Sequence, residues 1–237
     1  MYAVIVGVYM TEIEELLKTA CEAHLNGIRL PVWFVAPSGS GKSRMLQAIS
    51  MENPSVYYYE GSITANSLAV DLLPRLISGR YRTLIFDDLS HLSDKARPGV
   101  LEKFQQIADG KMIMNQFEVG LNHPSVVLNI IISCTPEYFS SKKIQTVLKQ
   151  TGLNDRFLIL NYQYSYATMT RALIEKSNNA PLIPIHLNGT KPRELSQDEK
   201  DELISRFSTC RQLGWAMALK SMTDIDFFKY MKGTIEI

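Results

Sequence analysis

Cysteine is scarce in this chain of 237 residues, and long hydrophobic runs are missing. The three cysteines, Cys21, Cys134 and Cys210, are widely spaced and odd in number, so they fit neither a disulfide framework nor a zinc motif. Each stands in an apolar or helical context, which predicts buried thiols in a reducing compartment. The apolar opening, residues 1–10, is half as long as the roughly 20 residues of a membrane helix and lacks the basic start of a signal peptide. These absences predict a cytoplasmic protein.

An excess of charge of either sign is also missing. Twenty-five Lys and Arg residues stand against 24 Asp and Glu residues, which gives a formal net charge of +1. That balance argues against a strongly basic protein that coats nucleic acid, although it leaves room for a local basic stripe. The composition, with 46% hydrophobic and 21% charged residues, is that of a globular protein, and the length favours one core with a small appendage.

The sequence does contain an alternation of short apolar runs with amphipathic segments. Helices are predicted over residues 11–25, 42–50, 67–77 and 100–108. Buried strands are predicted over residues 30–35, 56–59, 83–86 and 157–160, and we expect Tyr57 to Tyr59 to be strand core with one face outward, not a base-stacking platform. Strands that alternate with helices predict an α/β fold, a three-layer αβα core with a mainly parallel sheet.

A hairpin is predicted late in the core. Its arms are the runs 112–119 and 125–133, which flank turn formers at 120–124, and the second arm continues into the sheet.

The C-terminal part has a different character. Residues 177–195 are irregular, and three short helices are predicted between 196 and 232. We therefore predict a core over 1–176, a linker over 177–195 and a small α-helical lid over 196–237. Residues 1–9 fit either an upstream extension or a short edge strand.

The strongest motif is an eight-residue segment between a predicted strand and a predicted helix, Ala36-Pro37-Ser38-Gly39-Ser40-Gly41-Lys42-Ser43. It matches the Walker A, or P-loop, pattern, with Ala36 in place of the first glycine. The glycines let backbone amides and the helix N-terminus point at phosphate oxygens. Lys42 is expected at the β- and γ-phosphates, and the Ser43 hydroxyl is expected on Mg²⁺. The segment predicts nucleotide binding.

An acidic pair, Asp87-Asp88, ends the apolar strand 83–86. Asp87 is expected to hold Mg²⁺ through water, and Asp88 to orient or deprotonate an attacking water. The alternative is that the two adjacent acids merely cap the loop after the strand.

Together these motifs resemble those of the AAA+ ATPases, over about residues 11–232. The resemblance implies an ATP hydrolase that uses ATP with Mg²⁺ and works as an oligomer. Thr135, after the run 130–134, is similar to the family's γ-phosphate sensor, where Asn is commoner. Arg156 resembles the arginine finger that reaches a neighbouring subunit's nucleotide, and Arg211 resembles the second sensor arginine of the lid.

Each of these three residues also has a purely structural explanation. The Thr135 hydroxyl fits the start of a turn before Pro136. Arg156 fits a surface pair with Asp155, and Arg211 fits simple surface capping of a helix.

The resemblance points in two directions on what the ATPase acts upon. The Asp-Asp ending looks like that of helicase loaders and of the ATPase helpers of insertion-sequence transposition, which implies a homo-oligomeric ring or filament with DNA or a DNA-bound protein as partner. The predicted hairpin resembles that of helicases and of MoxR-type chaperones, so a chaperone for protein partners is the alternative. A third possibility is a nucleotide-gated assembly switch with little turnover, because Asp88 stands where Glu is usual.

Overall fold

A computed structural model of the chain describes residues 11–72, 74–75, 78–114, 117–120, 129–163, 170 and 182–231. Five strands form one sheet in the order β2-β3-β6-β1-β7, and every neighbouring pair is parallel. Their bounds are β1 (Val32–Val35), β2 (Val56–Glu60), β3 (Thr83–Asp87), β6 (Asn129–Cys134) and β7 (Leu158–Asn161). The predicted parallel α/β sheet is confirmed.

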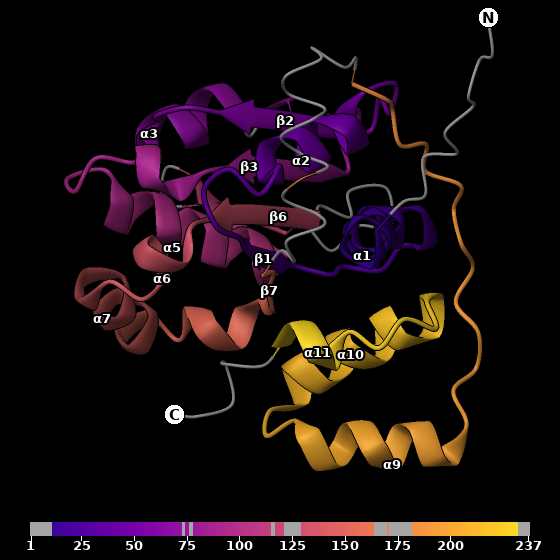
Figure 1. The fold of residues 1–237 in the computed structure, drawn as a ribbon. Coiled ribbons are helices and arrows are strands. Elements are labelled where there is room, and N and C mark those ends of the chain that lie inside the picture. Colours follow the sequence, from indigo (N-terminus) through magenta and orange to yellow (C-terminus); the bar gives the residue numbers. More distant parts are fainter. Residues whose placement is uncertain are drawn as a thin grey trace, which may run out of the picture.

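Helices cover both faces of this sheet (Figure 1). Alternate strand residues point to opposite faces, so Phe34 and Ile85 join one hydrophobic cluster while Trp33 and Phe86 join a second. The first cluster contains residues of α1 (Glu12–Glu22), α2 (Lys42–Ser50) and the C-terminal helices. The second contains residues of η2 (Leu68–Leu72), α5 (Arg97–Ala108) and α7 (Lys142–Thr151). The predicted three-layer αβα core is therefore confirmed.

Short elements connect these layers. They are η1 (Ala23–Asn26), α3 (Ala65–Ser67), η3 (Leu89–His91), α6 (Pro136–Phe139) and η5 (Leu153–Arg156). The predicted helix 67–77 is observed as α3 followed by the π-helical turn η2, and its part beyond residue 75 includes positions outside the described residues.

The hairpin differs from its prediction. Strands β4 (Lys111–Met114) and β5 (Phe117–Gly120) pair antiparallel with each other, and β6 lies in the main sheet between β3 and β1. The predicted pairing of 112–119 with 125–133 is therefore wrong. The sequence is consistent with this difference, because the polar residues Asn115 and Gln116 divide the run 112–119 into two apolar parts. Residues 121–128, which contain most of the predicted turn, lie outside the described residues.

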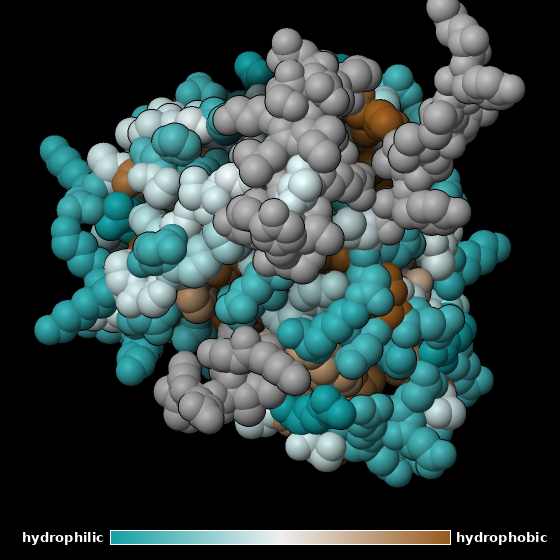
Figure 2. Space-filling view, viewed as in Figure 1, coloured by the Kyte–Doolittle hydropathy of each residue, from teal (hydrophilic) through white to brown (hydrophobic). Residues whose placement is uncertain are grey.

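Three tail helices follow, α9 (Gln197–Arg206), α10 (Cys210–Met222) and α11 (Phe228–Met231), as predicted. Trp215, Leu219 and Phe227 are buried in the same cluster as Leu16 of α1 and Leu158 of β7. Figure 2 shows hydrophilic residues over most of this face, with hydrophobic ones gathered where the tail helices meet the core. The tail helices thus complete the core on the α1 side. The division of the chain at 176 and 195 stays a prediction.

The irregular segment 182–195 crosses from the core to α9 along one side of the molecule (Figure 1). Two buried polar side chains hold it. The Glu22 carboxylate accepts from the backbone amides of Asn188 and Thr190 at 2.7 and 3.1 Å. The Asn53 side chain donates to the carbonyl of Ile185 at 2.8 Å. Side chains of the core therefore satisfy backbone groups that no sheet or helix pairs.

Two cysteines, Cys21 and Cys134, are buried as predicted. The prediction is wrong for Cys210, which is exposed because it is the first residue of α10, directly after the N-cap Thr209. In the described part of the chain, no helix combines the length and hydrophobicity that a membrane crossing requires.

A buried amide joins α1, β1 and β6. Asn129 is fully buried at the first position of β6. Its side-chain oxygen accepts from the amides of Leu30 and Ile130 at 3.1 and 2.9 Å, and its nitrogen donates to the carbonyl of Ala20 at 2.5 Å. One side chain therefore satisfies three backbone groups away from water.

We expect Asn129→Ala to lower the free energy of unfolding by about 2–5 kcal/mol, because it leaves buried backbone groups without hydrogen-bond partners. Urea titration followed by circular dichroism measures this loss. The matched control is Asn26→Ala, which removes an amide that donates to Thr190 in an exposed position, and for which we expect a loss below about 1 kcal/mol. Equal losses in the two variants would contradict the role given to Asn129.

Candidate functional site

The glycine-rich segment 36–43 forms a tight turn between β1 and α2. The amide of Ser40 donates to the carbonyl of Pro37 at 3.2 Å, which closes the turn. Gly39 and Gly41 have φ angles of 77° and 82°, in the left-handed region that favours glycine. A Cβ atom at either glycine would meet nothing within 4 Å, so the space beside the turn is open. Backbone conformation, not crowding, requires glycine at these two positions.

The N-terminus of α2 lies at this turn with no side chain capping it among the described residues. Its first amides therefore remain available to a ligand, and the helix dipole favours an anion there. The hydroxyl of Ser40 is buried and has no hydrogen-bond partner in the part of the chain that the structure describes. A buried polar atom without a partner is costly, and a phosphate oxygen would satisfy it. The segment fits a nucleotide phosphate on these observations.

Lys42 lies between the two acids that follow β3. Its side chain is only 6% exposed, and its Nζ is 3.5 Å from Oδ1 of Asp87 and 3.2 Å from Oδ2 of Asp88. A buried ammonium group requires such partners, since an unpaired charge away from water is strongly unfavourable. The structure thus brings together the lysine of the turn and both predicted acids, although they are distant in the sequence.

Asp87 is fully buried and has two further donors. The Tyr58 hydroxyl of β2 donates to Oδ2 of Asp87 at 2.8 Å, and the Ser133 hydroxyl of β6 donates to Oδ1. Burial and the charge of Asp87 both raise the pKa of Tyr58, so its hydroxyl remains a donor. Donors from three different elements therefore fix the orientation of this carboxylate.

Asp88 adopts a backbone conformation that is rare for its residue type, with φ 58° and ψ 83°. Its amide donates to the Ser133 hydroxyl at 2.9 Å, and its Oδ1 accepts from the amide of Ser90 at 3.1 Å. Partial burial raises the pKa of Asp88, but the hydrogen bonds from Ser90 and the charge of Lys42 outweigh it, so the pKa lies below its usual value. Asp88 caps the loop, as the alternative expected, and also pairs with Lys42.

Ser133 lies in the candidate site, although the sequence did not indicate it. It contacts Asp87, the amide of Asp88 and, at 3.5 Å, Nζ of Lys42. Phe86 lies opposite Ile132 in the paired strands β3 and β6, so Asp87 and Ser133 follow side by side. The available signal was a single hydroxyl within the apolar run 130–134.

Thr135, the predicted phosphate sensor, follows the end of β6. Its hydroxyl accepts from the amide of Tyr138 at 3.3 Å and caps the short helix α6. The turn that was the alternative for this residue is thus observed, and the part of Thr135 in sensing stays a prediction. Ser43, the predicted Mg²⁺ ligand, lies in the first turn of α2.

The two predicted arginines meet at a different place. Arg156 donates through Nε to Oδ2 of Asp109 at 2.8 Å and through Nη1 to the carbonyl of Gly152 at 2.8 Å. Nη1 of Arg211 lies 3.4 Å from Oδ1 of the same Asp109, the residue that follows α5. The structure therefore brings Arg156 and Arg211 together on one acid. Arg156 pairs with Asp109 here, not with the neighbouring Asp155 that sequence reasoning considered.

Within the described residues, no three side chains of His, Cys, Asp or Glu gather into a metal site. Mg²⁺ at nucleotide sites commonly takes one or two protein oxygens and completes its shell with phosphates and waters. Ser43 and Asp87 fit that mode, since one supplies a hydroxyl beside the turn and the other a buried, oriented carboxylate.

The comparisons with known proteins are limited. No protein-family model and no curated protein matches this chain. Among solved structures, it is similar to AMPPCP-bound DnaA from Aquifex aeolicus, with a TM-score of 0.41 and 13% sequence identity. The match covers 93% of this chain and 64% of the DnaA chain, so this chain spans less than two thirds of that structure. At this level of similarity we transfer no residue role or activity from DnaA.

Proposed function

We propose that this chain is an Mg²⁺-dependent ATPase of AAA+ type that works as an oligomer. One observation carries the proposal: Lys42 lies between Asp87 and Asp88, beside a helix N-terminus that two left-handed glycines leave open. A cation, two acids and a row of backbone amides at one point are the groups that phosphoryl transfer requires.

The roles follow from these positions. The free backbone amides at the end of the segment 36–43 and the Lys42 ammonium bind the phosphates, because both lie at the start of α2. Ser43 and Asp87 hold Mg²⁺, which neutralises phosphate charge when it is bound. Asp88 orients an attacking water and accepts its proton, since its ionised carboxylate lies beside Lys42 directly after β3.

Three further residues complete the proposed site. Thr135, beyond the end of β6, senses the γ-phosphate, and Arg211 couples the lid to the nucleotide state. Arg156 completes the site of a neighbouring subunit in a homo-oligomeric ring or filament. In the chain described here Arg156 and Arg211 are paired with Asp109, so their action on a nucleotide requires that pairing to break.

The substrate of this ATPase is proposed to be nucleic acid or a DNA-bound protein. The resemblance of the Asp87-Asp88 ending to loaders and transposition helpers supports this choice, with a chaperone acting on protein partners as the runner-up. Added DNA distinguishes the two candidates, because only an ATPase that acts on nucleic acid should change its rate of ATP hydrolysis in response.

A nucleotide-gated switch with little turnover is the second candidate, and the geometry of Asp88 favours it. Ser90 and Lys42 engage the two carboxylate oxygens of Asp88, and its shorter side chain stands where Glu is usual in the family. A base held in this way reaches an attacking water less easily.

The first test is steady-state ATP hydrolysis, measured alone and with single-stranded or duplex DNA at low salt, where phosphate contacts are strongest. We expect Lys42→Ala to abolish turnover and any stimulation by DNA, because the phosphates lose their main cation. The matched control is Lys149→Ala, which removes an exposed lysine of α7 and should retain wild-type turnover. Full hydrolysis by the Lys42→Ala protein would remove the proposal.

A second variant distinguishes motor from switch. If the length of the Asp88 side chain limits hydrolysis, Asp88→Glu should raise kcat about tenfold or more, because the carboxylate then reaches the water. Single-turnover hydrolysis with wild-type protein in parallel measures the change. An unchanged kcat would count against distance as the limit.

A third prediction concerns assembly. Arg156→Ala should lower hydrolysis by about 10³-fold or more while nucleotide binding persists, because a finger acts only on transition-state charge. Mixing this variant with Lys42→Ala protein should restore part of the activity, since each supplies what the other lacks. Arg206→Ala, at an exposed pair with Glu202, is the control for loss of an arginine. A lower melting temperature with no rescue would instead assign Arg156 a structural role through Asp109.

A further inference from the structure

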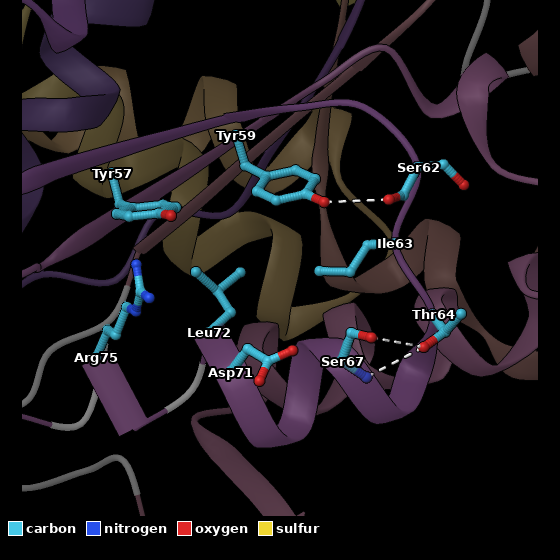
Figure 3. Close-up of a pocket in the computed structure, with 9 residues that line it drawn as sticks. All are labelled: Tyr57, Tyr59, Ser62, Ile63, Thr64, Ser67, Asp71, Leu72 and Arg75. Carbon is cyan, nitrogen blue, oxygen red and sulfur yellow. Dashed lines mark hydrogen bonds between the residues drawn. The ribbon is translucent and has the colours of Figure 1, made fainter.

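A cavity of about 370 Å³ has no residue of the segment 36–43 in its lining. Figure 3 shows the residues that line it. It opens between β2, an edge strand of the sheet, and the helical turns that follow it. Tyr57 and Tyr59 line one wall, and Ile63 and Leu72, both buried, line the bottom. The cavity therefore combines two aromatic rings with an apolar floor.

The two tyrosines are held in place from behind. Tyr59 stacks on Phe86, with ring centroids 5.2 Å apart at 20°, and its hydroxyl donates to the carbonyl of Ser62 at 3.1 Å. Tyr57 meets the ring of Tyr81 edge to face at 4.9 Å. Both belong to alternate positions of β2, so they share one side of the strand. The rings form a rigid wall.

Two opposite charges stand at the rim. Asp71 and Arg75 are exposed, and neither side chain has an ion-pair or hydrogen-bond partner within the described part of the chain. Figure 3 shows Arg75 next to Tyr57, and Asp71 between Arg75 and Ser67, so the two charges occupy different positions along the helical side of the cavity. They are available to a ligand with a donor at one end and an anion at the other.

The wall that carries Asp71 has an uncommon backbone. Residues Leu68–Leu72 form a π-helical turn, a conformation that is rare and found often at functional sites. This wide turn brings both the carboxylate of Asp71 and the apolar side chain of Leu72 to the cavity.

We infer that this cavity binds an unpaired base of a single nucleic-acid strand together with its phosphate. The base stacks on the tyrosine wall, an exocyclic amine of cytosine or adenine donates to Asp71, and the phosphate pairs with Arg75. A duplex is excluded, because its paired bases present no free ring face. A single cationic side chain fits less well, because it would pair with Asp71 and leave Arg75 without a partner, whereas a nucleotide satisfies both charges.

This inference deepens the nucleic-acid part of the proposed function and rests on it. It also revises the expectation for Tyr57 to Tyr59. Tyr58 reaches Asp87 and Tyr57 and Tyr59 line the cavity on the other side of β2, in line with a strand that has one face outward; only the proposed stacking departs from that expectation.

The test is fluorescence anisotropy with labelled single-stranded oligo-dC and oligo-dT at low salt, without ATP. Tyr57→Leu and Tyr59→Leu should each weaken binding of oligo-dC about five- to hundredfold, because each removes a stacking surface. Tyr57→Phe and Tyr59→Phe are matched controls that keep the rings and should bind as the wild type does.

The charges at the rim give independent readouts if a leucine variant fails to fold. Arg75→Gln should reduce the slope of log affinity against log salt by about 0.7, since one phosphate contact is lost. Asp71→Ala should remove the preference for oligo-dC over oligo-dT, because thymine has no exocyclic amine. Both residues are exposed, so neither change threatens the fold.

Two outcomes overturn the inference. The first is wild-type affinity for oligo-dC in both leucine variants. The second is displacement of the oligonucleotide by free dCMP at equal nucleotide concentration. It would show that the cavity binds a mononucleotide and not a nucleic-acid strand. Failure of the proposed ATPase is separate: oligo-dC bound by wild-type and Lys42→Ala protein without any hydrolysis would remove the ATPase and keep the cavity.

Discussion

The buried carboxylate of Asp87 is the constraint on which the centre of this molecule depends. A charge without water requires donors, and here they come from Lys42 at the start of α2, Tyr58 on β2 and Ser133 on β6. These contacts are possible only if β2, β3 and β6 lie side by side in parallel register, with α2 beside their C-terminal ends. The contacts that satisfy this one acid thus depend on the observed strand order, and they link the candidate site to the fold.

A second acid, Asp109, pairs with arginines away from the candidate phosphate site. It receives Arg156 and Arg211, and its charge also acts on the partly buried Arg29. These contacts join the residue that follows α5 to η5 and to the first turn of α10, so they tie the tail helices to the core. The residues that the family resemblance assigns to phosphate contacts across and within subunits are therefore paired inside one chain. Assembly would have to exchange these partners, and the desolvated acid left behind sets part of its cost.

The fold could be predicted because its strands and helix starts each have a local signature in the sequence. Strands buried on both faces give continuous apolar runs, and the caps at Thr11 and Ser196 mark helix starts directly. The partners of the acids could not be predicted, since Ser133 lies 46 residues from Asp87 and Arg156 lies 47 residues from Asp109. The hairpin prediction was wrong for a related reason. The runs 112–119 and 125–133 could pair with each other by their local pattern, and the position of β6 in the main sheet depends on strands that are distant in the sequence.

The edge strand β2 carries residues of both the proposed phosphate site and the proposed base-binding cavity. Its residues alternate between the layers, so Tyr58 reaches Asp87 on one side while Tyr57 and Tyr59 line the cavity on the other. A ligand affects catalysis only if it binds two arrangements of the protein with different affinity. Among the described residues β2 pairs with one strand, β3, and Tyr58 of β2 donates to Asp87 at 2.8 Å. Because that hydrogen bond orients the carboxylate assigned to Mg²⁺, a base stacked on Tyr57 and Tyr59 would affect the phosphate site through any displacement of this strand.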